Sequence, residues 1–449
     1  MINYLPIALA LILSCALLYF AFISHRENER RATRVAVLLS IVVPVSIALM
    51  MLLPSTIQVI SFAFIFGLGV VAILLVLFAR GFGETVLPVP MGRIDERDTM
   101  FARQRLVPGS ENYEEYYSRH PKLKEVDDQI RRAPGLLSPL AKEYHPYAAA
   151  LTGAAFDTID ALHALVEPSP SALQVGIDPQ AASQYVIGIA KHLGALQAGV
   201  TRLRDYHVYS HAGRRVGNYG VRIQLDHHYA IAISVEMSHD NVQLAPQMMQ
   251  TAEVAKQYLN SATIAVQIAK AIASLGYRAR AHIDGNYQVV CPLVAQDAGL
   301  GVIGRMGILM SEKAGPRVRL AVVTTDLPLL ENSASPDVSM WEFCRICRKC
   351  ADNCPTRSIS SDEPIDIGGV QRWQIRSETC YHYWNTIGTD CGRCLAVCPY
   401  SHPNTFAHNF VRWTTKRSAL AQRALLFMDD LFYGREPEPR KLPSWLPHP

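Results

Sequence analysis

Eight of the ten cysteines of this 449-residue chain lie close together near its C-terminal end, and their spacing constrains the fold more than any other feature. They form two runs. The first reads Cys-x2-Cys-x2-Cys-x3-Cys-Pro from Cys344 to Pro355, and the second reads Cys-x10-Cys-x2-Cys-x3-Cys-Pro from Cys380 to Pro399. This spacing is typical of proteins that hold two iron-sulfur clusters, in which the last cysteine of each run ligates the other cluster.

The crossed pattern predicts two sets of four ligands, each for one 4Fe-4S cluster. The first set is Cys344, Cys347, Cys350 and Cys398, and the second set is Cys354, Cys380, Cys391 and Cys394. The second set is irregular, because ten residues separate its second and third members. Zinc sites and disulfides are the alternatives, but two Cys-Pro ends fit zinc poorly and disulfides need an oxidising compartment.

The N-terminal end is far more apolar than the rest of the chain. Residues 5–23, 35–53 and 57–78 are nearly free of charge, and each is long enough as a helix to cross a hydrocarbon core of about 30 Å. A cleaved signal peptide is the alternative for the first run, which lacks a basic start and a clear cleavage site. We therefore predict a three-helix, multi-pass anchor in the inner (cytoplasmic) membrane.

Charge in the connecting loops predicts the orientation of this anchor. The first loop, residues 24–34, carries four arginines, and the second, residues 54–56, carries no charge. Because positively charged loops stay on the cytoplasmic side, the chain after residue 80 is expected in the cytoplasm. Arg30-Arg31 could imitate a twin-arginine export signal, but it follows a complete spanning segment.

The rest of the chain is expected to form a multi-domain α/β protein. Residues 91–335 are ample for a hydrophobic core of their own, which exceeds what a carrier of clusters needs. The net charge of +4 is too small to indicate a nucleic-acid partner. The predicted division is a membrane anchor at 1–80, a linker at 81–90, a catalytic domain at 91–335, a two-cluster domain at 336–404, and an extension at 405–449 that packs on the catalytic domain.

Three elements stand out within the large domain. Residues 229–237 (YAIAISVEM) and 318–325 (VRLAVVTT) read as buried strands, and residues 246–275 read as a long amphipathic helix. Gly276 follows the helix at the position that glycine favours. Tyr258 shares one face of this helix with a row of alanines, so the periodicity by itself favours a packed core residue.

Two cofactor motifs are suggested by the residues, but one lacks the expected context and the other lacks a residue. Gly299, Gly301 and Gly304 spell G-x-G-x-x-G, but they do not follow a convincing strand, so a nicotinamide or flavin site is disfavoured. Asp205 and His207 begin the D-x-H-x-x-G motif of base-on cobalamin proteins, but Ser210 replaces its glycine.

Several segments in order resemble the corrinoid-dependent reductive dehalogenases, over roughly residues 91–435. They are RIDERDTMFAR (Arg93 to Arg103), LVPGSENYEEYYSRHPKLKEVDD, YAIAISVEM, AGLGVIGRMG, GPRVRLAVVTTDLPL, the cysteine runs and MDDLFYG (Met428 to Gly434). The cysteine runs alone are also similar to those of epoxyqueuosine reductases, which act on transfer RNA. The three N-terminal segments resemble the small anchor protein that accompanies exported members as a separate chain.

The resemblance implies a nitroreductase-like domain that holds a base-off corrinoid (cobalamin), followed by a ferredoxin-like domain with two 4Fe-4S clusters. Electrons would pass through the clusters to cobalt, and a halogen on an organohalide would be replaced by hydrogen. The expected partners are the organohalide, membrane lipid and an electron donor (a ferredoxin, a reductase or a quinol), without nucleic acid.

The resemblance also assigns roles to single residues. Tyr258 matches the proton donor of the family, and Arg319 matches a nearby cation, which should make the phenol more acidic. Asp284 stands where some members carry an asparagine beside the substrate. The implied corrinoid contacts are Gly299, Gly301, Gly304 and Glu236.

The function predicted from these features is that of a membrane-anchored reductive dehalogenase. Two alternatives stay open. One is an enzyme that resembles epoxyqueuosine reductase, and the other is a membrane electron-transfer subunit that carries iron-sulfur clusters without a corrinoid.

Overall fold

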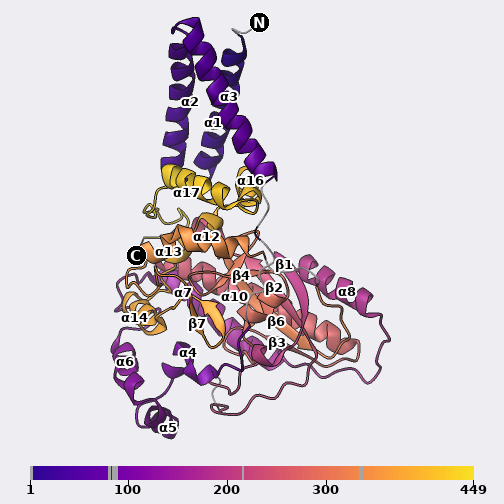
Figure 1. The fold of residues 1–449 in the computed structure, drawn as a ribbon. Coiled ribbons are helices and arrows are strands. Elements are labelled where there is room, and N and C mark those ends of the chain that lie inside the picture. Colours follow the sequence, from indigo (N-terminus) through magenta and orange to yellow (C-terminus); the bar gives the residue numbers. More distant parts are fainter. Residues whose placement is uncertain (1–3, 79–81, 83–88, 215–216, 333–336, 449) are drawn as a thin grey trace. The chain divides into compact units, whose positions relative to one another are not determined.

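The computed structural model describes residues 4–78, 82, 89–214, 217–332 and 337–448 (Figure 1). The chain divides into two compact units, which are described separately. The anchor unit comprises residues 1–85 and 402–437, and the catalytic unit comprises residues 86–401 and 438–449. Most of the predicted linker, residues 81–90, lies outside the described residues.

In the described residues of the anchor unit, all of the regular secondary structure is helical. Two of the three predicted spans, Pro6–Arg26 and Arg30–Met50, are long and apolar enough to cross a membrane, by length and composition alone. In the third helix the apolar stretch Ser55–Val71 is shorter, so a third span stays a prediction. The helices are α1 (Tyr4–Arg26), α2 (Arg30–Met50), α3 (Ser55–Phe78), α16 (Phe406–Thr415) and α17 (Ala419–Tyr433).

The C-terminal helices belong with the N-terminal ones. Phe432 of α17 is buried together with Ala21, Ala32 and Ala36, and its ring meets that of Phe20 edge to face with centroids 4.9 Å apart. Small side chains on α1 and α2 leave room for these rings. The structure groups residues 402–437 with α1 and α2, and the expected packing of residues 405–449 on the catalytic domain stays a prediction.

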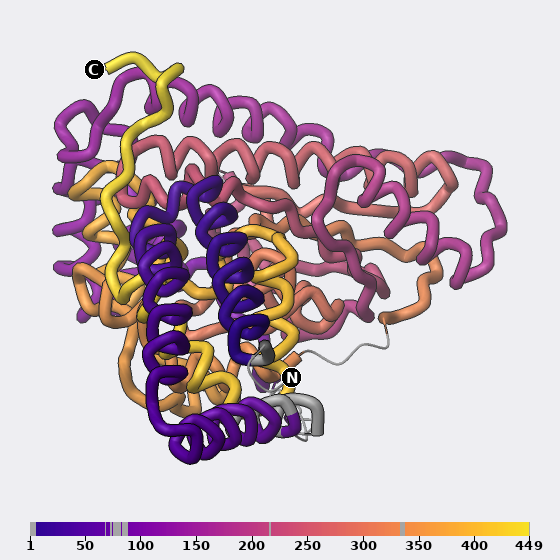
Figure 2. Tube along the Cα trace, turned by 90° about the horizontal axis from the view of Figure 1, so that it is seen from above, coloured from indigo at the N-terminus to yellow at the C-terminus, as the bar shows by residue number. Residues whose placement is uncertain are grey.

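Only the last residues of the extension belong to the catalytic unit. There Leu442 and Leu446 pack against α7 (Pro146–Leu162) and α10 (Met248–Ser274), where the yellow end of the chain is drawn in Figure 2. Gln247 adds a hydrogen bond of 3.0 Å from its side-chain amide to the carbonyl of Arg440.

An antiparallel sheet organises the catalytic unit, with strand order β1-β2-β6-β3. The two central strands are those predicted from the sequence, and Ile231 of one lies opposite Val323 of the other. The edge strands pair with them in antiparallel register. The bounds are β1 (Gln197–Arg202), β2 (Tyr229–Glu236), β6 (Val318–Thr325) and β3 (Ala279–His282).

Side chains of the central strands alternate between two apolar layers, as the period of two requires. Ile231, Ile233 and Val235 face the layer that contains α10 and α8 (Pro179–His192), whereas Ala230 and Ala232 face α11 (Cys291–Asp297). The helix predicted at 246–275 is confirmed as α10. Of its 27 residues 18 are buried, and these include polar residues such as Gln250, Glu253 and Gln257, which therefore lie inside the unit.

The cysteine region is part of the same compact unit. Arg103, which is 3% exposed, forms ion pairs with Asp127 at 2.6 Å and with Glu378 at 2.8 Å. Because Glu378 lies between the two cysteine runs, these pairs link the cysteine region to the rest of the unit. Removing one partner of such a buried pair costs about 3–5 kcal/mol. The boundary predicted at 335/336 therefore falls inside one compact unit, and it stays a prediction.

Short elements complete the catalytic unit. The helices are α4 (Met100–Arg103), α5 (Glu111–Arg119), α6 (Pro121–Arg132), α9 (His239–Val242), α12 (Ser339–Cys347), α13 (Lys349–Asp352), α14 (Ser377–Ile387) and α15 (Arg393–Ala396). The two hairpins are β4 (Gly301–Ile303) with β5 (Leu309–Ser311), and β7 (Ile365–Ile367) with β8 (Val370–Arg372).

Candidate active site and iron-sulfur centres

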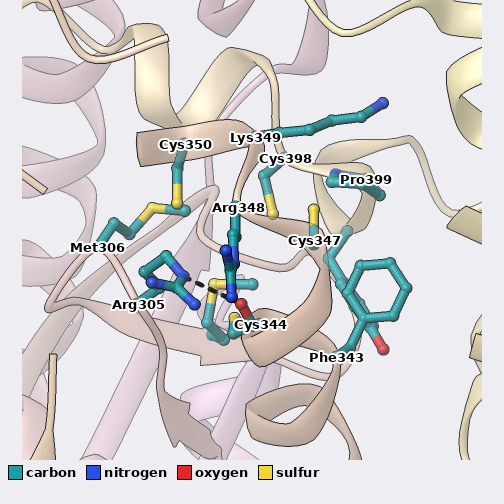
Figure 3. Close-up of a pocket in the computed structure, with 12 residues that line it drawn as sticks. Arg305, Met306, Phe343, Cys344, Cys347, Arg348, Lys349, Cys350, Cys398 and Pro399 are labelled. Carbon is teal, nitrogen blue, oxygen red and sulfur yellow. Dashed lines mark hydrogen bonds between the residues drawn. The ribbon is translucent and has the colours of Figure 1, made fainter. Parts of the chain in front are cut away.

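The first predicted set of cysteines lines a single cavity. Cys344, Cys347 and Cys350 come from α12 and α13, and Cys398 joins them from the second run (Figure 3). All four side chains are buried. Burial raises the pKa of Cys350 well above its ordinary value, and the three other thiols of the set add to this rise. Four buried cysteines around one cavity suit a bound cation, because cysteine ligates metal ions in its thiolate form.

Basic side chains surround this cavity. Arg305, Arg348 and Lys349 line it together with the cysteines (Figure 3). Arg305 is fully buried and donates from Nε to the carbonyl of Cys344 at 3.0 Å and from Nη1 to the carbonyl of Ser360 at 2.7 Å. The arginine thus fixes the chain around the cavity and offsets the negative charge that thiolate ligands bring.

The second set also gathers at one place. Burial raises the pKa of Cys380 to about 12, with Cys354 and Cys391 as the next contributions, and it raises the pKa of Cys391 to about 11. For Cys394 burial again dominates, and the other three thiols of the set add to it. Helix α14 brings Cys380 to this place, which explains the irregular spacing. The structure groups the cysteines as the crossed pattern predicts, and iron ligation stays a prediction.

Cys354 differs from the other ligands in its set. Burial acts to raise the pKa of its thiol, but backbone N–H groups of Ile359, Thr356 and Ser358 outweigh burial and lower it. The N–H of Ser358 donates to its Sγ at 3.2 Å. Hydrogen bonds of this kind stabilise a thiolate, which suits a cluster ligand.

Tyr258 and Arg319 meet as the resemblance implies. Tyr258 extends from α10, and the guanidinium carbon of Arg319, on β6, lies 5.2 Å from the centroid of its ring. Burial raises the pKa of Tyr258, while the charge of Arg319 acts in the opposite direction. The effect of Arg319 has the predicted sign, but burial outweighs it.

Asp284 forms an ion pair that the sequence did not indicate. Its Oδ1 lies 3.3 Å from Nη2 of Arg214, and both side chains are largely buried. His163 contacts the carbonyl oxygen of Asp284 through Nε2 at 2.7 Å. The charges of Asp284 and Arg214 act on the pKa of Tyr258 in opposite directions, so these two residues belong to the surroundings of the phenol.

The segment from Arg93 to Arg103 holds Arg214 in place. Glu96 is 2% exposed and accepts hydrogen bonds from the backbone N–H groups of Gly213 at 2.7 Å and Arg214 at 3.2 Å. Burial raises the pKa of Glu96 despite these donors. Sequence reasoning missed Arg214, because nothing in the local pattern distinguishes it from a surface arginine.

Asp390 connects the phenol with the second set of cysteines. It directly precedes Cys391, accepts a hydrogen bond from Oγ1 of Thr251 at 2.8 Å, and lies 3.9 Å from Nη2 of Arg319. Burial raises the pKa of Asp390, and Arg319 and Thr251 oppose that rise. The sequence carried one signal for this residue, namely its position next to a cysteine ligand.

The predicted corrinoid contacts have clear roles in the fold. A Cβ at Gly301 would lie 2.0 Å from the carbonyl oxygen of Met310, so glycine is needed for the pairing of β4 with β5. A Cβ at Gly304 would lie 2.7 Å from Cγ of Met310. Gly299 adopts a positive φ of 78° in the turn after α11. Glu236 accepts a hydrogen bond from Arg317 at 3.0 Å.

The histidine of the incomplete cobalamin motif is part of the core. His207 is fully buried; its Nδ1 accepts the backbone N–H of Arg204 at 3.1 Å, and its Nε2 lies 3.0 Å from the carboxylate of Asp297. Both ring nitrogens are thus engaged within the protein. The glycine motif follows helix α11 and contains strand β4, so a helix precedes it where a dinucleotide site requires a strand.

Comparison with known proteins identifies a family model and several relatives. A model described as "4Fe-4S dicluster domain" matches residues 343–402. A tetrachloroethene reductive dehalogenase of Desulfitobacterium hafniense is 34% identical over 215 residues, which cover 45% of this chain and 38% of the relative. The protein of the same name from Sulfurospirillum multivorans is 33% identical over 212 residues, covering 45% and 42%.

A more distant relative is an epoxyqueuosine reductase of Lactococcus garvieae. It is 29% identical over 113 residues, which cover 24% of this chain and 31% of the relative. The alignments span about two fifths or less of the length of all these relatives.

Solved structures extend the comparison to most of the chain. The catabolic reductive dehalogenase NpRdhA matches with a TM-score of 0.65 and 23% identity, over 80% of this chain and 51% of that chain. Its complex with 3-bromo-4-hydroxybenzoic acid matches with a TM-score of 0.64 and 22% identity, over 80% and 51%. The protein therefore has a reductive dehalogenase fold that includes a C-terminal 4Fe-4S dicluster domain.

Proposed function

We propose that this protein is a membrane-anchored reductive dehalogenase. In the reaction an organohalide takes up two electrons and one proton, the carbon–halogen bond breaks, a carbon–hydrogen bond forms, and halide leaves. One observation carries the proposal. Two separate sets of four cysteines lie in the same compact unit as Tyr258, and Cys394 of the second set packs in the same apolar cluster as this tyrosine.

A corrinoid fits the surroundings of Tyr258. The buried Nε–H groups of Arg214 and Arg319 have no hydrogen-bond partner among the described residues, which suits a ligand rich in acceptor oxygens. When bound, the corrinoid supplies a cobalt centre that accepts the electrons and acts on the carbon–halogen bond. Because His207 is engaged in the core, a base-off cofactor is expected. Gly299, Gly301, Gly304 and Glu236 are proposed to border it.

Tyr258 is proposed to donate the proton. Its raised pKa keeps the phenol protonated at neutral pH, so that a proton is present when the substrate binds. Arg319 lies over the ring at 5.2 Å and stabilises the phenolate that remains. Asp390 and Asp284 each pair with one of the two arginines and so set how much positive charge the phenol experiences.

The two clusters are proposed to deliver the electrons. The basic residues around the first set compensate the charge of a reduced cluster, since Arg305, Arg348 and Lys349 border its cavity. An external ferredoxin, reductase or quinol would refill the clusters. The names of the relatives suggest chlorinated ethenes or halogenated phenols as substrates.

Helices α1 and α2 are proposed to anchor the enzyme in the inner membrane with α3 as a third span. Exposed arginines at the turn between α1 and α2, Arg26, Arg30 and Arg31, favour a cytoplasmic position of this turn.

The decisive experiment measures metals and activity on one preparation. Protein purified without oxygen from cells supplied with corrinoid should contain about eight irons and one cobalt, with a base-off electron-spin signal. It should release halide from tetrachloroethene or 3-bromo-4-hydroxybenzoate when a strong reductant is present. Eight irons without cobalt after attempted reconstitution would indicate an electron-transfer subunit, and reduction of epoxyqueuosine in transfer RNA would indicate the other enzyme class.

A further inference from the structure

Two histidines and a glutamate meet inside the anchor unit, apart from the cysteines. Glu27 lies in the turn between α1 and α2, His402 in the segment before α16, and His408 in α16. One ligand atom from each lies within 4.8 Å of the other two. Glu27 is 8% exposed and His408 is 6% exposed, so this Glu–His–His cluster lies away from water.

The two imidazole rings and the carboxylate lie close enough to share one ion. His402 and His408 are stacked nearly parallel, with centroids 4.6 Å apart and an angle of 7° between planes. Nε2 of His408 lies 2.9 Å from Oε2 of Glu27. An ion about 2.0–2.2 Å from both atoms would subtend an angle of roughly 90° to them, which is common for six-coordinate metals.

Carboxylates around the cluster would complete the site. Oδ1 of Asp429, on α17, lies 3.4 Å from Nε2 of His402, an arrangement that orients metal-binding histidines. Glu29 also places an oxygen within 4.8 Å of His402. Arg412 donates to the carbonyl of His402 and to Oδ1 of Asn409, so the segment is fixed before any ion binds.

We propose that Glu27, His402 and His408 bind a divalent transition-metal ion, Zn²⁺ or Fe²⁺, that ties the α1–α2 turn to the segment following the cysteine runs. Two imidazoles and a carboxylate are typical of these ions. The stacked rings support this assignment, because a shared ion requires both imidazoles to be neutral and thereby removes the repulsion between two imidazolium rings. The ion would hold α16 against α1 and α2, on whose ends α17 rests (Figure 1).

The first test is metal binding by the full-length protein in detergent without oxygen. Separate samples are equilibrated with Zn²⁺ or with Fe²⁺, freed of weakly bound metal, and analysed for metal per chain. We expect one tightly bound zinc, or one ferrous ion beyond the eight cluster irons. Glu27→Gln and His402→Ala should lower this affinity at least tenfold with unchanged cluster iron, whereas His25→Ala, an exposed histidine two residues before Glu27, should match the wild type.

X-ray absorption at the zinc edge of the wild-type protein keeps the test decisive even if a variant fails to fold. The proposed site gives only nitrogen and oxygen neighbours at about 2.0–2.2 Å. Zinc–sulfur scattering at about 2.3 Å would place the metal on cluster cysteines and overturn the proposal. Absence of tight binding of both ions would do the same, and would leave Glu27 and His408 as a buried ion pair.

Discussion

The two regions of the catalytic unit, the cysteine sets and the surroundings of Tyr258, are built in opposite ways. The cysteines come from one short part of the chain, and short helices with two- and three-residue gaps place them. The surroundings of Tyr258 come from positions as distant as Arg214, Arg319 and Asp390, which meet only because β6, α10 and the cysteine region pack together. A local motif is therefore readable from sequence, whereas an assembled site needs the fold.

The largest expected effect is the loss of a local ligand. Cys350→Ala should remove one cluster, so iron falls from about eight to about four per chain and dehalogenation is abolished, because a three-thiolate site holds the cluster poorly. Iron analysis and electron-spin spectra measure this. Cys291→Ala, which changes a buried cysteine outside both sets, should keep all its iron. Full iron content in Cys350→Ala would refute the ligand assignment.

Next in size is the loss of the proposed proton donor. Tyr258→Phe should lower the rate of halide release by about 10²–10⁴-fold, the usual contribution of a general acid, with iron and cobalt retained. The matched control is Tyr277→Phe, whose hydroxyl donates to the carbonyl of Val175 at 2.8 Å in the core of the unit. A fully active Tyr258→Phe enzyme would exclude the tyrosine as donor and leave the cysteine sets unaffected.

A smaller effect should appear in the pH profile. Asp390 raises the pKa of Tyr258 and Arg319 lowers it, so Asp390→Asn should lower that pKa and Arg319→Gln should raise it. Because the donor acts in its protonated form, activity declines as pH rises through this pKa. The alkaline limb of log kcat should move to lower pH in Asp390→Asn and to higher pH in Arg319→Gln, by about one unit or less.

The control for this pair is Asp326→Asn, which removes the surface partner of Arg278 and should leave the limb in place. Shifts of the same sign in both variants would show that the two residues act on something other than the charge at Tyr258.

The smallest effect on catalysis should come from a change in packing alone. Ile268 of α10 is fully buried beside the sheet, and Ile268→Ala should lower the free energy of unfolding by about 2–5 kcal/mol. The rate per folded molecule should stay the same, and the exposed Lys270→Ala on the same helix should change neither quantity. Thermal unfolding and active-site titration separate the two readouts. A large loss of rate with unchanged stability would contradict this prediction and would mean that Ile268 contributes to catalysis.

Much of the fold was predictable because its signals are local. The central strands at 229–237 and 318–325 and the helix at 246–275 were identified by apolar runs and a glycine stop, and the structure agrees within two residues at each end. The packing of the tail at 405–437 could not be read from the sequence, because it depends on Ala21, Ala32 and Ala36, whose significance appears only when Phe432 lies against them. Burial, which sets the net direction of the pKa shift of Tyr258, likewise could not be judged from a motif.

By itself the sequence determined the cysteine spacing, the apolar N-terminal segments and the elements of the sheet, because each depends on residues that are neighbours along the chain. The tertiary structure decided which side chains surround Tyr258, that Asp390 joins Arg319 to the second cysteine set, and that Glu27 meets His402 and His408. These contacts join residues that are far apart along the chain. Their energies come from desolvation and from charges held a few ångströms apart, which only the packed chain determines.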